Sequence, residues 1–410
     1  MRDYFVLHLN QNISQSSVPY RLVAALDKVG IRSEILAMHS KVDDDRIHIV
    51  NLPIIYRIRR KLRLNIYKLR LKKYPKRKNN MLISNFDVGV NIKNNATFIK
   101  SDVVILHWIW GNFVSAETLD KIMSSGKKVI MVCHDNCHFT GGCHVRMGCN
   151  NYKNGCGNCT QLESKDAKDI TFKQYQKKKR VYDKHDFIVV SPSSWMDNNV
   201  ASSGLLKKKR HVIIPNPIDT DFFVPQKKGK NSDDGVIRLL FGAVNAVSTP
   251  YKGYKELMDT LGILEDMVED STEIVAYVFG ASGDDKTLGK RIKIHFLGYL
   301  DQTKMVDAYN MADVYVVPSL EDSFNNTVAE SLATETPVAS FATGGIVDII
   351  DHKKNGYLAK YASSDDLAQG IYWIINNNSE NILGKNGRQK IKNSFSYEVV
   401  GNMYKKLIEE

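Results

Sequence analysis

Residues 314–346 read VYVVPSLEDSFNNTVAESLATETPVASFATGGI, and this stretch decides the fold. It opens with the apolar, β-branched run Val314–Val317, which is typical of a buried strand. A polar loop follows at 321–326, and from Thr327 onward apolar residues recur with the spacing of a helix. The run Val338–Phe341 is again apolar and strand-like. Strand, loop, helix and strand in this order predict one unit of a parallel α/β sheet.

The polar loop at 321–326 stands between the end of a strand and the beginning of a helix. Open α/β sheets bind ligands at this edge, and the N–H groups and dipole of the helix favour a phosphate there. Asp322 and Glu330 flank this position and could accept hydrogen bonds from a sugar or a ribose. Glu330 could equally be an ordinary acid of the first helical turn, which the dipole favours. Gly344 and Gly345 would let a second turn of backbone approach the same ligand.

Five features of this stretch occur in the order of a known signature: the Pro-Ser turn, the two acids with seven residues between them, the helix, the Pro337-Val338 turn and the Gly-Gly turn. The stretch resembles the retaining nucleotide-sugar glycosyltransferases of family 4, with Asp322 in the place of the usual first Glu. The resemblance implies the GT-B fold, in which two Rossmann-like α/β domains face each other across a cleft. It also implies that the C-terminal helix crosses back to the first domain.

The function that the resemblance implies is transfer of a sugar with retention at the anomeric carbon. The donor would be a nucleotide diphosphate sugar, a UDP-sugar by default. The acceptor would be a glycan or a polyprenyl-diphosphate-linked oligosaccharide in bacterial surface polysaccharide synthesis. Two rival interpretations are a nucleotide-sugar hydrolase or epimerase on the same fold, and a catalytically silent membrane-associated scaffold.

The resemblance also implies roles for single residues. Lys252, in a Lys-Gly pair, would hold the donor diphosphate, so that the chemistry needs no metal. Glu330 would accept from the ribose and Asp322 from the transferred sugar, and His134, at the end of a predicted strand, would contact the donor sugar. The other donor-binding residues expected are Gly242, Asn245, Gly298, Tyr299, Ser323, Phe324, Asn325, Asn326 and Thr327. On the acceptor side we expect Ser16, Ser17 and Asp135.

Two departures from the family pattern concern these roles. The Arg that usually stands five positions before the lysine is Val247 here, and Asn245 could take its place. The first loop, NISQSSVPY, lacks the usual glycines. On residue type alone, Lys252 could be an ordinary loop lysine and His134 a structural histidine.

The length of 410 residues is enough for two domains, each with its own core. We expect an N-terminal acceptor domain at 1–218, a donor domain at 219–392 and a returning C-terminal helix at 393–410, with a Lys- and Asp-rich surface loop at 227–235. No apolar run approaches the ~18 residues that span a bilayer. No signal peptide is recognisable either, so the expected location is cytoplasmic.

The net charge of +12 is concentrated in one segment, because residues 57–78 hold twelve Lys or Arg and no acid. An apolar stripe of isoleucines and leucines at spacings of four and three runs through the basic segment 53–78: Ile54, Ile58, Leu62, Ile66 and Leu69. A basic amphipathic helix is typical of a protein that lies on an anionic membrane, here the inner face of the plasma membrane. The alternative is a solvated helix that packs on its own domain through the stripe. One isolated basic stretch does not indicate nucleic-acid binding.

All six cysteines fall between Cys133 and Cys159. The last four, spaced C-x5-C-x6-C-x2-C within a Cys-rich loop at 137–160, suit a structural zinc ion: Cys143, Cys149, Cys156 and Cys159. His138 or His144 could replace one thiol, and free thiols or a redox pair are the alternative. The loop resembles one found in a subset of bacterial polysaccharide glycosyltransferases.

Overall fold

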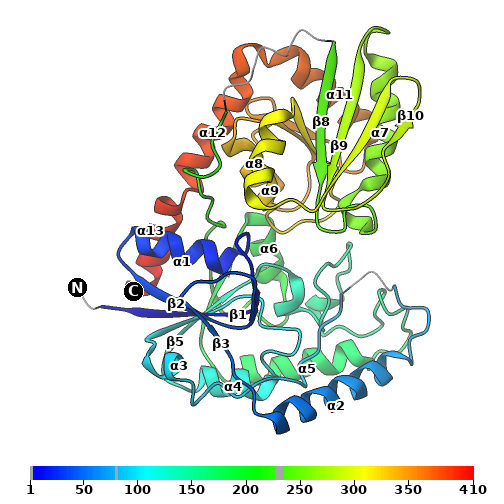
Figure 1. The fold of residues 1–410 in the computed structure, drawn as a ribbon. Coiled ribbons are helices and arrows are strands. Elements are labelled where there is room, and N and C mark those ends of the chain that lie inside the picture. The colour runs from blue at the N-terminus through cyan, green and yellow to red at the C-terminus, as the bar shows by residue number, and fades with distance from the viewer. Residues whose placement is uncertain (1–2, 79–81, 227–234) are drawn as a thin grey trace. The chain divides into compact units, whose positions relative to one another are not determined.

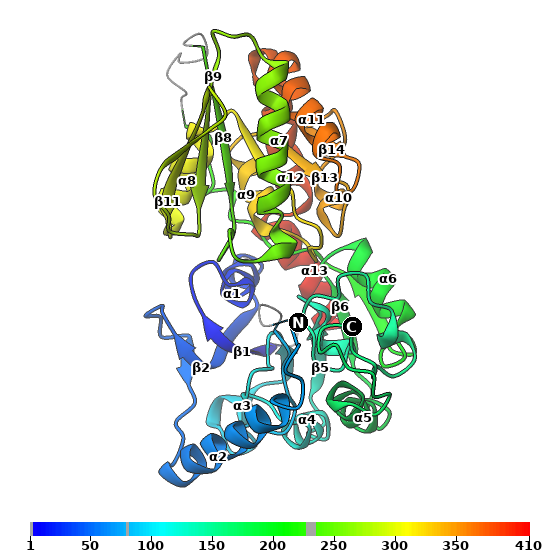
Figure 2. The same ribbon diagram turned by 90° about the vertical axis from the view of Figure 1, so that its right-hand side faces the viewer.

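The computed structural model describes residues 3–78, 82–226 and 235–410. It divides into two compact units: residues 1–217 with 400–410, and residues 218–399. The ribbon is drawn in two views in Figures 1 and 2. The surface loop expected at 227–235 lies outside the described residues except for Gly235.

The first unit is built on a seven-stranded sheet in which every neighbouring pair is parallel. Its order is β3-β2-β1-β4-β5-β6-β7. The strands are β1 Phe5–Ile13, β2 Arg32–Ser40, β3 Ile47–Ile49, β4 Val103–Leu106, β5 Lys128–Val132, β6 Ile188–Ser191 and β7 Arg210–Ile213. The helices are α1 Val18–Lys28, α2 Ile54–Leu71, α3 Ala96–Lys100, α4 Ala116–Met123, α5 Ile170–Tyr182 and α6 Ser194–Ser202, with short 3-10 helices η1 Asn136–Phe139 and η2 Asn151–Lys153.

The second unit has a seven-stranded sheet of order β10-β11-β9-β8-β12-β13-β14, parallel except for the edge strand β10. The strands are β8 Val236–Gly242, β9 Glu273–Phe279, β10 Lys286–Leu288, β11 Ile292–Gly298, β12 Val314–Val317, β13 Val338–Phe341 and β14 Gly356–Ala359. The helices are α7 Tyr254–Met267, α8 Gln302–Met311, α9 Asn326–Ala333, α10 Ile346–Ile349, α11 Ser364–Asn377 and α12 Ile382–Ser394, with η3 Pro250–Lys252 and η4 Ser379–Asn381. The predicted fold class, two parallel-sheet α/β domains, is confirmed.

Each sheet reverses its strand order beside its first strand. In the first unit the chain proceeds from β1 to β2 and β3 on one side, and β4 lies on the other side. In the second unit β9 and β11 lie on one side of β8, and β12 lies on the other. Doubly wound sheets bind ligands beyond the carboxyl ends of the two strands that flank this reversal. The fold therefore gives each unit one favoured ligand edge.

Strand β1 continues through the polar residues 10–12 to Ile13, so it includes the first two residues of the segment NISQSSVPY that we expected to form a loop. Ile13 is buried in a small cluster with Val23 of α1 and Ile35 of β2. Burial of this side chain explains why the strand extends through a polar segment.

The C-terminal helix α13, Tyr397–Glu409, adds its residues from Val400 onward to the first unit. Lys405 Nζ donates to the carbonyl of Val29 at 2.9 Å, and Lys128 Nζ donates to that of Leu407 at 2.7 Å. Val400 is completely buried, whereas Met403 is 39% exposed.

Helix α2 turns its apolar stripe to the solvent, so the alternative in which the stripe packs on its own domain is wrong. The stripe residues are 41% to 75% exposed: Ile54, Ile58, Leu62, Ile66 and Leu69. Tyr67, on the opposite side of the helix, is buried, and its hydroxyl donates to the carbonyl of Ile83 at 3.2 Å. None of the described helices has the length and apolarity needed to cross a membrane.

Candidate functional site

A lysine and a carboxylate meet at the reversal point of the second sheet. Lys252, at the end of the loop after β8, places its Nζ 2.8 Å from Oδ2 of Asp322, in the loop after β12. Burial alone would lower the pKa of Lys252, but the Asp322 carboxylate raises it above its ordinary value. The sequence predicted both residues, and the structure brings them together.

The amino end of α9 lies beside this pair. Asn325 adopts a left-handed conformation, with φ of 72°, and its side-chain oxygen caps the helix by accepting from the Val328 N–H at 3.1 Å. Its amide donates to Asp322 at 3.2 Å. The Thr327 hydroxyl donates to the same Asn325 oxygen at 2.7 Å. These contacts fix the loop in which Ser323 and Asn326 lie partly exposed.

Two glycines let the neighbouring backbone approach closely. Gly253 has φ of +77°, and a Cβ there would lie 1.8 Å from the carbonyl oxygen of Pro318. Gly344 has φ of +56°, and a Cβ there would lie 1.9 Å from the carbonyl oxygen of Asp322. Any larger residue at either position would displace the loop that carries the Lys252–Asp322 pair.

Glu330 is only 5% exposed, and its Oε2 accepts a hydrogen bond from the Tyr309 hydroxyl of α8 at 3.0 Å. Tyr309 is fully buried. Sequence reasoning singled out Glu330 but not Tyr309, because nothing local in the sequence relates two residues on different helices. Phe324, another expected donor-binding residue, is buried and packs against Phe395.

The remaining predicted donor residues lie at the ends of β8 and β11. Asn245, after β8, accepts a hydrogen bond from the exposed Tyr299 hydroxyl at 2.9 Å. Gly298 ends β11, and its carbonyl accepts from the Gly280 N–H at 2.7 Å. Gly242 is the last residue of β8, and a Cβ on it would lie 2.5 Å from the ring of Phe279. Asn245, Gly298 and Tyr299 therefore belong to the strand-end edge on which Lys252 also lies.

In the first unit, His134 follows β5 and is the end of a row of three hydrogen-bonded histidines. Its Nε2 lies 2.8 Å from Nδ1 of His107, which follows β4. The Nε2 of His107 lies 2.9 Å from Nδ1 of His8, within β1. His8 and His107 are completely buried, and His134 is partly exposed. Sequence reasoning identified only His134.

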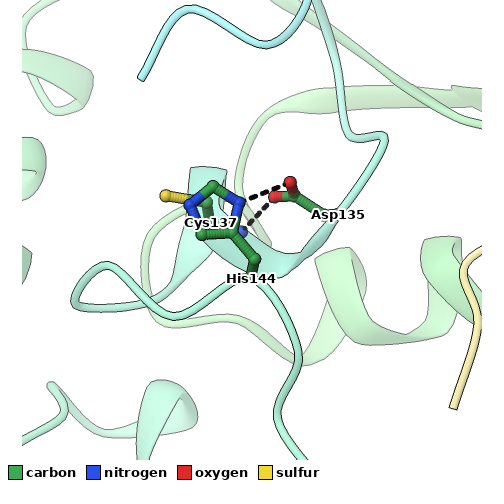
Figure 3. Close-up of side chains that lie close together, drawn as sticks. All are labelled: Asp135, Cys137 and His144. Atoms are coloured by element: carbon green, nitrogen blue, oxygen red, sulfur yellow. Dashed lines mark hydrogen bonds and ion pairs between the residues drawn. The ribbon is translucent and has the colours of Figure 1, made fainter. Parts of the chain in front are cut away.

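Asp135 forms a buried ion pair in which one oxygen serves two donors. Its Oδ2 lies 2.6 Å from Nδ1 of His144 and accepts from the Trp108 indole at 2.9 Å, while Oδ1 accepts from the Cys137 N–H. Burial alone would lower the pKa of His144, but the Asp135 carboxylate raises it to about 10. The imidazole of His144 faces the carboxylate in Figure 3.

Within the described residues, the potential ligand atoms of Asp135, Cys137 and His144 lie within 4.8 Å of one another. This set differs from the four predicted thiols. Nε2 of His144 is 2.8 Å from the Ser84 hydroxyl, so both of its ring nitrogens have hydrogen-bond partners. The set therefore fits a charged hydrogen-bonded pair better than a metal centre.

The Cys-rich loop is held by a buried lysine. Lys178 of α5 is completely buried and donates to the carbonyl of Thr140 at 3.0 Å and to that of Cys137. Lys178 therefore does not belong to the solvated face of this basic helix, because the loop and the Phe86 ring cover it. All four predicted thiols are free, and burial raises the pKa of Cys143 and Cys156.

The two serines expected on the acceptor side lie in the turn before α1. Ser17 is the N-cap residue but makes no side-chain capping bond, because its hydroxyl donates to the Ser14 carbonyl at 2.6 Å. Ser16 is exposed, and its hydroxyl lies 3.2 Å from that of Ser14.

The fold and the strand-end sites define an α/β protein of the doubly wound, two-domain GT-B class. Residues 241–390 match the family model described as Glycosyl transferases group 1. The matched segment lies within the second unit and includes Lys252, Asp322 and Glu330.

Two of the curated relatives of this chain are named as glycosyltransferases. An uncharacterized glycosyltransferase of Methanocaldococcus jannaschii is 25% identical over 73% of this chain and 81% of its own length. The capsular polysaccharide biosynthesis glycosyltransferase CapM of Staphylococcus aureus is 25% identical over 52% of each chain. The chain thus spans most of the first relative and about half of the second.

Solved structures show the same fold at low identity. The sucrose-phosphate synthase of Thermosynechococcus elongatus superposes with a TM-score of 0.64 at 15% identity, covering 99% of this chain and 98% of its own. The Anabaena protein HepE, in complex with UDP and glucose, gives a TM-score of 0.60 at 12% identity and covers 99% of each chain.

Proposed function

We propose that this protein transfers a sugar from a nucleotide diphosphate sugar to a hydroxyl of a glycan or a polyprenyl-diphosphate-linked acceptor, with retention at the anomeric carbon. The observation that carries the proposal is the Lys252–Asp322 pair beside the amino end of α9, at the ligand edge of the second sheet. This edge offers a fixed cation and backbone N–H groups to a diphosphate, and a carboxylate to sugar hydroxyls.

Lys252 stabilises the leaving diphosphate in this proposal. A lysine ammonium has three N–H donors, and one of them points to Asp322. The other two remain for phosphate oxygens, and the N–H groups at 325–327 add further donors. Because such fixed donors need no reorganisation as charge develops, they replace the divalent ion that other sugar transferases use. A zinc ion held by the Cys-rich loop would be structural.

The two carboxylates bind opposite ends of the donor. Asp322 accepts from hydroxyls of the transferred sugar, and Glu330 accepts from the ribose. The Tyr309 hydroxyl holds one oxygen of Glu330 and orients the other. The UDP and glucose in the HepE structure, and the capsule role in the name of CapM, support a UDP-sugar donor and a surface polysaccharide product.

We also propose that α2 holds the protein on an anionic membrane, where lipid-linked acceptors lie. The exposed stripe of α2 offers aliphatic side chains to the acyl boundary, and basic residues flank it. Figure 1 shows α2 along the outer edge of the first unit. A pocket of about 460 Å³ between α2 and α5 adds positive charge beside the stripe; its basic lining residues are Arg70, Lys73, Lys173, Lys177 and Arg180. Each basic residue near an anionic surface contributes roughly 1 kcal/mol of attraction.

A nucleotide-sugar screen by thermal shift tests donor binding. A UDP-sugar at about 100 times its Kd should stabilise the parent by about 2.7 kcal/mol. Lys252→Met should lose most of this effect, whereas Lys255→Met, which changes a lysine on the exposed face of α7, should keep it. If every nucleotide sugar leaves the parent unshifted, the donor site is wrong.

Vesicle co-sedimentation tests the membrane contact. The parent should bind vesicles rich in anionic lipid and not neutral ones. Ile58→Glu should weaken binding at least about tenfold, since it removes apolar burial and adds a repelled charge. Ile99→Glu is the matched control, because Ile99 on α3 is also exposed, at 61%. Equal binding by both variants would count against α2 as the contact.

A further inference from the structure

The pocket of about 460 Å³ in the first unit lies between the end of α2 and helix α5. Its volume falls within the range of roughly 300–1,000 Å³ that is usual for small-ligand sites. Its charged lining residues are all basic, and no acid is found among the described residues that line it. A hollow with this lining can surround one compact anion, which is more than a charged surface does.

Two sets of contacts join the walls of this pocket. Oδ2 of Asp87 accepts a hydrogen bond from Arg70 of α2 at 3.2 Å, and Oδ1 of the same side chain accepts from Lys177 of α5. The Tyr74 hydroxyl, in the turn after α2, accepts from the N–H of Ile170, the first residue of α5, at 3.1 Å. Because these contacts hold α2 and α5 together, the pocket is formed before a ligand binds.

Three cations of the lining are left for a ligand. Lys73, Lys173 and Arg180 are exposed, and in the part of the chain that the structure describes their side chains take part in no ion pair. Like charges that face one hollow repel one another, so the free energy falls most when an anion with more than one charge enters. The pocket therefore favours a compact, multiply charged anion.

A phosphomonoester or a diphosphate is the anion that suits these side chains best. At pH 7 a phosphomonoester carries a charge of about −1.5 to −2 and presents three strong acceptor oxygens. The guanidinium of Arg180 can bind two phosphate oxygens in parallel, and the lysines act as point charges. A phosphodiester carries a single charge and has one fewer terminal oxygen, so it satisfies fewer of the three cations.

The position of the pocket relative to the apolar stripe of α2 indicates where the phosphate comes from. Leu69, the last residue of the stripe, is 59% exposed and directly precedes Arg70 of the pocket. Ile66, one helical turn before Arg70, is 41% exposed. A helix that buries such a stripe at the acyl boundary holds its basic flank among the lipid headgroups. A headgroup can then enter the pocket while acyl chains contact the stripe.

We propose that the pocket between α2 and α5 binds the phosphomonoester or diphosphate headgroup of a lipid in the membrane that α2 contacts. The lipid source rests on the membrane contact of the proposed function, whereas the preference for a multiply charged phosphate rests on the pocket alone. The pocket shares no residue with the predicted donor and acceptor residues. The bound headgroup thus adds a specific contact to the diffuse attraction of the basic helix, and it directs the protein to membranes that carry such lipids.

Vesicle binding at equal surface charge tests the headgroup preference. Phosphatidylcholine vesicles contain either phosphatidic acid, a phosphomonoester, or phosphatidylglycerol, a phosphodiester, in proportions that give the same zeta potential. Diffuse attraction depends on the surface charge and gives equal binding to both kinds of vesicle. We expect the full chain to bind the phosphatidic acid vesicles at least about tenfold more tightly, the effect of one additional hydrogen bond to a charged group.

Two double variants supply a matched comparison. Lys173→Gln/Arg180→Gln removes two cations of the pocket, and Lys68→Gln/Lys72→Gln removes two exposed basic residues at the end of α2 that do not line it. The pocket variant should bind both kinds of vesicle equally. The control variant should bind both more weakly and keep the preference for phosphatidic acid. Circular dichroism of both variants should match the parent, because all four side chains are exposed.

Inorganic pyrophosphate distinguishes a lipid headgroup from a soluble ligand. At constant ionic strength it should abolish the preference of the parent for phosphatidic acid vesicles. It should also raise the Tm of the control variant more than that of the pocket variant, since both keep Lys252. If this difference in Tm is found but the parent prefers neither kind of vesicle, the pocket binds a soluble phosphate, and the lipid source is wrong.

The proposal is overturned if the parent binds neither kind of vesicle, binds both equally, or if the preference survives in the pocket variant. Sugar transfer by the parent is measured separately. If the parent transfers no sugar, the proposed transfer is wrong, and the vesicle comparison still decides whether the pocket binds a headgroup.

Discussion

The ion pair between His144 and Asp135 should stabilise the folded protein, and a stability measurement can distinguish this ion pair from a metal centre at the same residues. The two side chains are 8% and 21% exposed, and their nearest atoms are 2.6 Å apart. Asp135→Asn keeps the size of the side chain and removes its charge. The variant leaves His144 buried without its anion, so the folded state loses free energy.

The size of the loss follows from the pKa shifts of the two partners. Burial would lower the pKa of His144, but Asp135 and, to a smaller extent, Cys137 raise it from 6.5 to about 10, so at 1.36 kcal/mol per unit the contribution of Asp135 has a ceiling of about 5 kcal/mol. Burial raises the pKa of Asp135 and His144 lowers it, with a net shift from 3.8 to about 2, which corresponds to about 2 kcal/mol. We take the lower part of this range and expect Asp135→Asn to lose about 3 kcal/mol, in line with other broken buried pairs.

The pH dependence has a definite sign. The folded-state pKa of His144 is raised, so its contribution is complete below pH 6.5 and is lost as the pH rises toward about 10. The free energy of unfolding can be measured in urea at about pH 6 and about pH 9.5 with chelator present. Between these two pH values it should fall more for the parent than for Asp135→Asn.

A metal centre at the same residues would behave in the opposite way. Metal binding requires a neutral imidazole and a thiolate, so stability would rise with pH and fall when chelator is added. Equal slopes for parent and variant, or a parent that becomes more stable toward pH 9.5, would refute the ion-pair assignment.

Three further predictions concern the donor edge and the Cys-rich loop. Gly253→Ala should lower the free energy of unfolding by at least about 1 kcal/mol and also lower UDP-sugar affinity, because the added Cβ would clash with backbone atoms. Gly262→Ala, inside α7, is the control: its Cβ meets no atom, and the variant should be more stable by about 0.5–1 kcal/mol. Chemical denaturation measures the stability of both variants. Tyr309→Phe should weaken UDP-sugar binding about fivefold to tenfold in calorimetry by releasing Glu330; unchanged affinity would exclude this contact from donor binding. If the loop holds zinc, metal analysis should find one equivalent in the parent and less in a Cys156→Ser/Cys159→Ser variant; a zinc-free parent would end that interpretation.

Much of the fold follows from local patterns in the sequence. The apolar run Val314–Val317, its polar loop and the following helix occur as predicted because strand and helix periodicities are local properties. The proximity of Lys252 and Asp322 could also be predicted from the sequence, since both residues follow strands that end at one edge of the sheet. The continuation of β1 to Ile13 could not be predicted, because burial of Ile13 against the neighbouring strand outweighed the low strand propensity of the polar residues before it.

The features that the sequence did not reveal depend on contacts between distant segments. His8 and His107 are 99 positions apart, and each is an ordinary polar residue in or after an apolar strand. Lys178 lies in a strongly basic helix, and only the tertiary structure shows that the Cys-rich loop covers it. The stripe of α2 was visible as a pattern, but periodicity gives the same result for a buried and an exposed apolar face.

The central claim is that the Lys252–Asp322 edge binds a nucleotide sugar for transfer. The most direct measurement is release of nucleoside diphosphate from nucleotide sugars by the purified chain, with and without a lipid-linked or glycan acceptor. We predict release that depends on the acceptor, is at least about a hundredfold slower in Lys252→Met, and yields a product with the donor's anomeric configuration. Release of free sugar at the same rate without acceptor would indicate a hydrolase, and binding without any turnover would indicate a scaffold; either result would contradict the proposed transfer.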